Sequence, residues 1–166
     1  MSTAVAGKIS VVANLVLTNT IGLQAAVATL DRTLATVFTS GVGLNQVNRI
    51  YTELDKSLSA AYDLDLSGAL TDALGAACVF VRVKGLLAWT PTTNTGNVEI
   101  GGDAAAALFG FKDPTDVISV RPGGTLLLLA PDATGYAITA TTADILQFTP
   151  SAGTQLVSFC VIGGNA

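Results

Sequence analysis

The run of residues 63–70, DLDLSGAL, has the spacing of a ligand-binding motif. Asp63, Asp65 and Ser67 place oxygen atoms at alternate positions, as in the first half of a calcium-binding loop, and Gly68 follows at the sixth position. The twelfth position, where such a loop needs a bidentate carboxylate, is Leu74. An extended strand with these polar residues on its solvent face explains the same pattern. We therefore predict no metal site, and keep Asp63, Asp65 and Ser67 as the candidate ligands should one exist.

Side chains that could perform catalysis are scarce. The chain has no histidine, which excludes Ser-His-Asp triads, Cys-His pairs and histidine-ligated zinc. The Gly101-Gly102 and Gly123-Gly124 pairs lack the Lys-Ser/Thr and the helix start of a phosphate-binding loop. The carboxylates near prolines are typical of turn residues that cap their own backbone: Asp113, Asp116 and Asp132. We predict that the protein is not an enzyme and holds no cofactor.

The cysteines and the single tryptophan have plain structural interpretations. Cys78 and Cys160 lie in apolar runs, AACVFV and VSFCVI, which favours buried free thiols over a disulfide. Trp89 ends an apolar run, where the indole is typical of a core residue with its N–H at the rim. The alternative is that Trp89 and the loop at residues 92–97 present a site for a sugar or a partner.

Composition points to a subunit covered by other subunits. Half of the 166 residues are hydrophobic, only 12% are charged, and the net charge is −4. A soluble monomer normally carries about twice this share of charge. An acidic chain with 8 Lys and Arg is poorly suited to gripping phosphate backbones, so we expect no nucleic-acid partner. No apolar run reaches the length of a membrane span, and residues 8–28 are interpreted as mature chain rather than a signal peptide.

The hydrophobic pattern predicts an all-β fold. The stretch VISVRPGGTLLLLAP, residues 117–131, reads as strand, turn and strand, and we expect its two strands to be neighbours. Short apolar or alternating runs separated by turn residues recur along the chain without βαβ alternation. We predict an antiparallel β-sandwich, jelly-roll-like, as a single domain at residues 9–166.

The N-terminal part is harder to assign. Residues 1–8 have no hydrophobic period and are predicted to form an arm, followed by an alternating strand from Ile9 to Leu17. Residues 21–38 fit either an alanine-rich helix or a strand, because threonines lower the helical propensity. We expect this N-terminal segment to be less regular than the sandwich.

Pieces of the chain after residue 37 resemble a group of small structural proteins of tailed-bacteriophage virions. The pieces keep their order: FTSGVGLNQ from Phe38, RIY from Arg49, DLDLSG from Asp63, VRVK from Val81, TNT from Thr93, VRPGGTLLL from Val120, AP from Ala130, GYAI from Gly135, DIL from Asp144 and VIG from Val161. The resemblance implies a β-sandwich subunit of the head or tail without catalytic residues. The first 37 residues match less well, and we expect these residues to determine which partner the subunit attaches to.

The resemblance and the composition together lead to one functional hypothesis. We expect a capsid-associated decoration, cement or head-fibre base subunit that forms a homo-oligomer, preferably a trimer. Its expected partners are the major capsid protein or other virion proteins, in a virion assembled in the host cytoplasm, with no membrane partner. The N-terminal arm, with Met1, Ser2, Thr3 and Lys8, is the predicted interaction site. The alternatives are a tail or neck component, and a carbohydrate-binding module built on Trp89.

Overall fold

A computed structural model describes residues 4–21, 24–101 and 116–166. This part of the chain contains twelve β-strands and no helix. The strands are β1 Gly7–Ile21, β2 Gln24–Ser40, β3 Gln46–Val47, β4 Arg49–Leu58, β5 Tyr62–Asp65, β6 Arg82–Trp89, β7 Val98–Gly101, β8 Val117–Val120, β9 Thr125–Leu129, β10 Tyr136–Ala137, β11 Ile145–Pro150 and β12 Gln155–Gly164. The prediction of an all-β protein is confirmed.

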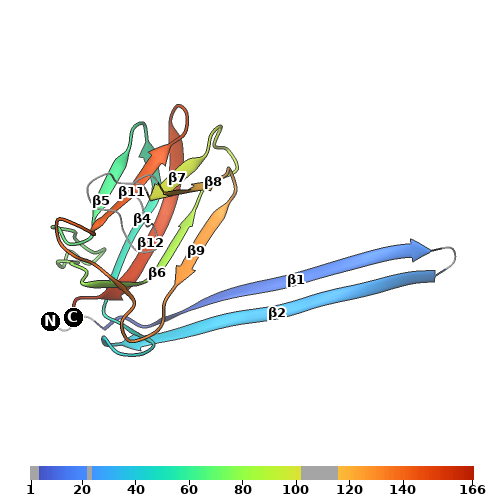
Figure 1. Ribbon diagram of the computed structural model, residues 1–166, viewed down its shortest axis with the longest axis horizontal. Helices are drawn as coiled ribbons and strands as arrows, with labels where there is room; N and C mark the ends of the chain where they lie inside the picture. The colour runs from blue at the N-terminus through green and yellow to red at the C-terminus, as the bar shows by residue number, and fades with distance from the viewer. Residues whose placement is uncertain (1–3, 22–23, 102–115) are drawn as a thin grey trace.

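Two antiparallel sheets pack face to face (Figure 1). The five-stranded sheet has the order β10-β6-β12-β4, with β9 paired to β6 beyond the end of β10. The four-stranded sheet has the order β5-β11-β7-β8. Most connections cross from one sheet to the other, so neighbouring strands are distant in sequence. Burial between the sheets, rather than local hairpin formation, therefore determines this part of the fold.

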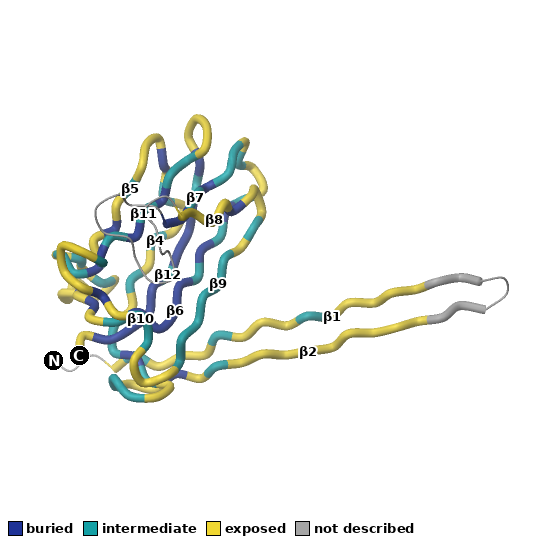
Figure 2. Tube along the Cα trace, in the orientation of Figure 1, coloured by how far each residue is buried: buried dark blue, intermediate teal, exposed yellow. Residues whose placement is uncertain are grey.

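The core consists of alternate residues from the inner faces of both sheets (Figure 2). Phe148 of β11 stacks on Phe159 of β12 with ring centroids 4.5 Å apart, which joins the sheets at their centre. Leu64, Leu86, Ile100 and Leu146 are fully or almost fully buried around this pair. Both rings lack solvent exposure, so removing one would leave a cavity that the rigid sheets cannot close.

We predict that Phe159→Ala lowers the free energy of unfolding by about 3–5 kcal/mol, the range for a buried phenylalanine. The matched control is Leu74→Ala, since Leu74 is 80% exposed and should change stability by less than about 0.5 kcal/mol. Urea denaturation at a fixed protein concentration measures both. Equal effects of the two substitutions would contradict the assignment of the core.

The prediction that residues 117–120 and 125–130 are neighbouring strands is wrong. β8 pairs with β7 in the four-stranded sheet, whereas β9 pairs with β6 in the five-stranded sheet. Gly124 N donates to Arg121 O at 2.7 Å and Gly123 has φ of 75°, the geometry of a type II turn at Pro122-Gly123. A type II turn does not match the twist of a hairpin, so it splays the two strands into different sheets.

Residues around this corner make its glycine sensitive to substitution. A Cβ atom added to Gly123 would lie 2.9 Å from Cγ2 of Thr92. Gly75 also has a positive φ, but a Cβ atom added there would have no other atom within 4 Å. Thr90 holds this turn in place with two hydrogen bonds. Its Oγ1 donates to Arg121 O at 2.7 Å, and its N–H donates to Gly124 O.

We predict that Gly123→Ala destabilises the protein more than Gly75→Ala. Both substitutions carry the backbone strain of an L-residue at positive φ, about 1 kcal/mol, but only the first adds a close contact with Thr92. Thermal unfolding of the two variants beside the parent measures the difference. Equal losses would show that the corner relaxes around the added methyl group.

The N-terminal segment is a long, regular hairpin rather than the less regular segment that the sequence suggested (Figure 1). β1 and β2 pair in unbroken register from Gly7↔Phe38 to Ile21↔Gln24. The ambiguity over residues 21–38 is resolved as strand for the described part, beginning at Gln24. At its base the hairpin adds a short parallel pair, β2 with β3.

The structure also divides the predicted arm. Met1, Ser2 and Thr3 lie outside the described residues, while Lys8 is already the second residue of β1, exposed and opposite Val37. Val5, between them, packs against the base of the hairpin. The regular pairing therefore begins before the predicted boundary at residue 8.

Candidate interaction surface

The hairpin has two faces of different character, because residues paired across the antiparallel strands share a side. One face, here called the apolar face, carries Val11, Leu15, Leu17, Leu30 and Leu34, with Ala13 and Arg32 between them. The other, the mixed face, alternates aliphatic with polar residues: Ser10, Val12, Asn14, Val16, Thr29, Asp31 and Thr33. The apolar face is the one expected to meet a partner.

No other part of the described chain covers the apolar face. Leu34 is 73% exposed, Leu17 is 71% exposed and Leu15 is 63% exposed. Figure 2 shows the hairpin exposed along most of its length, away from the sandwich. A two-stranded ribbon is marginally stable alone, and each aliphatic side chain gains about 1.5–3 kcal/mol on full burial.

The outer face of the five-stranded sheet, the side turned away from the core, is also apolar. It carries Ile50, Leu54, Leu87, Trp89, Leu127 and Cys160, as their alternation with core residues and the strand registers require. Leu54 is 70% exposed and Ile50 is 39% exposed. These residues form a second surface that a soluble monomer would leave in water.

The two surfaces meet at the root of the hairpin. Phe38, Val47 and Ile162 are buried there, with Ile9, Leu129 and Cys160 packed against them. Beside this cluster lies an apolar cavity of about 220 Å³ between residues 5–9 and the outer face, including Leu87 and Ile50. The hairpin base is thus seated directly on the outer face of the sheet.

A buried lysine fixes the loop after the hairpin. Lys84 of β6 is fully buried, and its Nζ donates to the carbonyl oxygens of Val42 and Gly43. Burial lowers the pKa of Lys84, as does the nearby Arg82, while Asp132 acts in the opposite direction. Its two carbonyl partners lie in the turn that follows β2, so Lys84 restrains the direction in which the hairpin leaves the sandwich.

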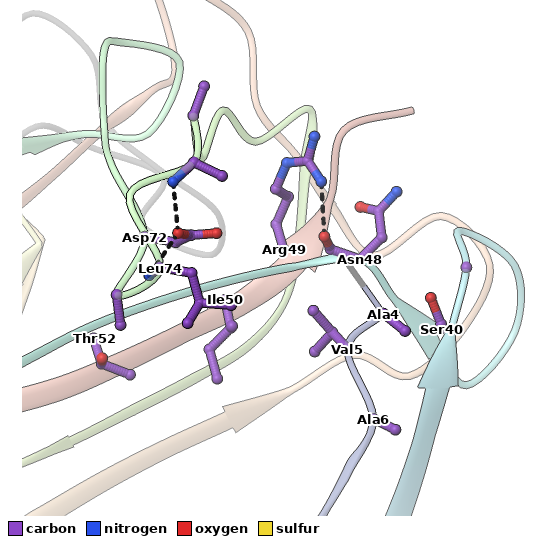
Figure 3. Close-up of a pocket in the computed structure, with 14 residues that line it drawn as sticks. Ala4, Val5, Ala6, Ser40, Asn48, Arg49, Ile50, Thr52, Asp72 and Leu74 are labelled. Carbon is purple, nitrogen blue, oxygen red and sulfur yellow. Dashed lines mark hydrogen bonds between the residues drawn. The ribbon is translucent and has the colours of Figure 1, made fainter. Parts of the chain in front are cut away.

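A wider hollow of about 680 Å³ adjoins this cavity and shares Val5, Ala6 and Ile50 with it (Figure 3). It is lined by small residues of the N-terminal segment and of residues 73–77, together with Ser40, Arg49 and Asp72. Two of its polar side chains bond to their own chain, although Arg49 Nε is buried without a hydrogen-bond partner among the described residues. Arg49 Nη1 donates to Asn48 O at 2.8 Å, and Asp72 Oδ1 accepts from the N–H groups of Leu74 and Ala76, each at 2.9 Å. This arrangement stabilises loops and does not converge on a ligand position.

A carboxylate cluster joins the sheets where β4 faces β5. Glu53 Oε1 accepts hydrogen bonds from Tyr51 Oη at 2.5 Å and Tyr62 Oη at 2.8 Å, and Lys56 Nζ lies 3.0 Å from Oε2. Lys56 also lies 3.9 Å from the centre of the Tyr62 ring. Partial burial opposes ionisation, yet these hydrogen bonds leave the pKa of Glu53 below its usual value. Burial and Glu53 raise the pKa of Tyr51 to about 12, so its proton stays in place at neutral pH.

We predict that Glu53→Gln destabilises the protein at pH 7 and that the difference from the parent shrinks as the pH falls. The folded-state pKa of Glu53 is lowered from 4.5, so its stabilisation is present above that value and is lost as the pH drops through the folded-state pKa. Urea midpoints between pH 7 and pH 3 measure this. Tyr62→Phe, which removes one donor, should show a smaller pH-dependent loss of the same sign. A pH-independent gap for Glu53→Gln would contradict the cluster's role.

The predicted metal ligands are occupied by hydrogen bonds of their own chain. Asp63 Oδ1 accepts from Gln147 Nε2 at 2.7 Å, and Asp65 Oδ1 accepts from Ser67 N at 3.0 Å. Ser67 Oγ donates to Asp144 Oδ2 at 2.7 Å, a partner that the sequence spacing did not reveal. Within the described ranges, no three His, Cys, Asp or Glu side chains lie close enough to hold a metal ion. Ser67 Oγ lies 3.1 Å from Asp65 Oδ1, whereas Asp63 is engaged with Gln147, so two of the three candidate ligands lie together.

Trp89 and the loop at residues 92–97 are placed apart from both hollows. Trp89 is half-buried on the outer face, between Ser158 and Thr125 of the neighbouring strands. Asn94 makes paired hydrogen bonds with the backbone of Leu156, and the N–H groups of Thr95 and Gly96 donate to Gln155 Oε1. The loop's polar groups therefore hold the loop on β12.

Both cysteines are free thiols, one buried and one half-buried. Burial raises the pKa of Cys78 to about 11 and that of Cys160 to about 11. Cys78 Sγ lies 3.4 Å from Ile50 O and serves as a weak donor. Thiols that stay protonated at neutral pH are poor nucleophiles.

No family model, curated protein or solved structure matches this chain. Among the described residues, none forms a helix long and apolar enough to cross a membrane. The surface formed by the hairpin and the outer face therefore has to be interpreted from its own geometry. The sequence signal that could have revealed it is the alternate spacing of Ala28, Leu30 and Leu34, which continues the pattern of residues 9–17.

Proposed function

We propose that this protein is a structural subunit of a tailed-bacteriophage virion that works as a homo-oligomer, most simply a trimer on the capsid surface. The observation that carries the proposal is the long hairpin with an exposed apolar face, projecting from a charge-poor sandwich. A projecting ribbon that cannot bury its own side chains is suited to grip a neighbouring subunit. The pieces from FTSGVGLNQ to the final VIG, which resemble small virion proteins, supply the context of a phage particle.

The assigned role is decoration, cement or the base of a head fibre, with the major capsid protein or another virion protein as partner. In this role the sandwich is the folded body, and the N-terminal residues Met1 to Thr3 contribute to attachment. A tail or neck subunit would use the same architecture. The jelly-roll relationship stays a prediction, because face-to-face packing of antiparallel sheets is common to several sandwich families.

The first test is to shorten the hairpin. Since Val11 and Leu34 form a hydrogen-bonded pair, replacing residues 12–33 by Asn-Gly closes the ribbon with a two-residue turn and leaves its root intact. We expect the parent to be an oligomer by light scattering and the shortened chain to be a monomer with the same thermal stability of the sandwich. A parent that is monomeric at all concentrations would contradict the proposal.

The second measurement addresses the virion. The parent chain, added to shells of the encoding phage that lack it, should bind at a fixed ratio to the major capsid protein, and the shortened chain should bind less. A variant lacking only residues 1–3 tests the attachment role of the terminus, since Val5 and the hairpin root remain. Binding of the parent to tails but not to shells would move the role to the tail.

A further inference from the structure

We propose that the apolar face of the hairpin lies on the outer face of the five-stranded sheet of a second copy of this chain. This inference rests on the proposed function only in requiring a homo-oligomer, and it names the two surfaces that meet. Each subunit would donate one hairpin and receive one; in the proposed trimer this contact is heterologous and closes into a ring.

The two surfaces already pack together within one chain. By register, Phe38 and Ile9 belong to the same side of the ribbon as Val11 and Leu34. At the root they pack with Ile162, Leu129 and Cys160 of the outer face. The apolar face of the hairpin and the outer face of the sheet are therefore complementary where they can reach each other.

Neither surface can complete this contact within its own subunit. The hairpin leaves the sandwich at its root and extends away from it (Figure 1). Leu15 and Leu30, paired opposite each other, are 63% and 47% exposed, and Leu54 on the outer face is 70% exposed. The apolar face of the hairpin and the outer face of the sheet are thus both available to a neighbouring copy.

The size of the contact follows from the length of the hairpin beyond its root. Ile9 and Phe38 already pack on their own subunit, so the free part of the ribbon begins at Val11. Residues 11–21 of β1, at about 3.3 Å each, make a ribbon about 36 Å long and about 10 Å wide, which offers about 360 Å² on one face. The contact then buries about 700 Å² counted on both partners, and the two contacts in which each subunit takes part bury about 1,400 Å² together, the size of a standard interface.

The charges are compatible with this contact. Arg32 is the charged residue of the apolar face, placed between Leu30 and Leu34. Asp55 lies at the edge of the outer face, where its Oδ1 accepts from Ser158 Oγ at 3.3 Å. The opposite signs avoid like-charge repulsion when the two surfaces meet.

The experiment uses Trp89, the single tryptophan, as a reporter on the outer face. In the full chain with Cys160→Ala, a bimane label is attached to one introduced cysteine on the apolar face: Leu15→Cys, Leu30→Cys or Leu34→Cys. Cys78 is fully buried and should not react. The matched control is Val16→Cys on the mixed face, where the parent valine is 67% exposed. Each labelled chain is also made with Trp89→Phe, and its mass is measured by light scattering.

We expect an oligomer in which at least one apolar-face label is quenched, with fluorescence restored by Trp89→Phe and by dilution to monomers. The Val16→Cys label should not be quenched. Leu30→Asp and Leu54→Asp should each shift the assembly toward monomers by at least tenfold in dissociation constant, whereas Val16→Asp should not.

Two outcomes would overturn the inference. An oligomer in which no apolar-face label is quenched by Trp89, or in which Leu54→Asp has no effect, would show that the hairpin covers another surface, while the proposed function stands. A monomeric parent chain would remove the homo-oligomer itself, and with it both proposals. Circular dichroism of every variant confirms that the sandwich remains folded.

Discussion

Strand β12 carries apolar side chains on both of its faces, and both must be kept from water. Phe159 and Val161 point into the sandwich, where Phe159 stacks on Phe148 of the opposite sheet. Cys160 and Ile162 point outward, where the root of the hairpin covers them. As a central strand between β4 and β6, β12 ties the core to the hairpin. The position of the hairpin depends on this outward half of β12.

Polar groups in this protein mostly support the backbone. Lys84 donates to two carbonyl oxygens after the hairpin, Asp132 Oδ1 accepts from the N–H groups of Thr134 and Gly135, and Gln155 holds the loop at residues 92–97. The Glu53 cluster closes the sandwich where β4 and β5 face each other. Because these groups are engaged within the chain, the surfaces left for partners are mainly apolar. Such a surface fits lasting assembly better than the exchange of small ligands.

Several features could be predicted from the residues because they depend on local chemistry. Alternation of apolar and polar residues from Ile9 to Leu17 predicts a strand, and β1 includes this segment. Asp63 and Asp65 lie on either side of the buried Leu64 in β5, as expected for an extended strand with one face in solvent. Low charge and high apolar content indicate surfaces that need covering. Other features could not be predicted. Ser67 meets Asp144 beside the pairing of β5 with β11 in one sheet, and Tyr62 meets Glu53 from the opposite sheet, contacts that no spacing along the chain encodes.

The sequence by itself determined that the chain forms strands and that Pro122-Gly123 makes a turn, because these depend on side-chain alternation and on the φ preferences of proline and glycine. Only the tertiary structure decided where those strands go. The splay of the type II turn sends β8 and β9 to different sheets, a matter of strand twist and core burial rather than of turn residues. For residues 24–38, alanine and threonine leave helix and strand nearly balanced in local free energy. Fifteen pairings with β1, along with burial of Phe38 at the root, decide for strand, because a helix in that place would bond its own backbone but leave the facing backbone groups of β1 unpaired.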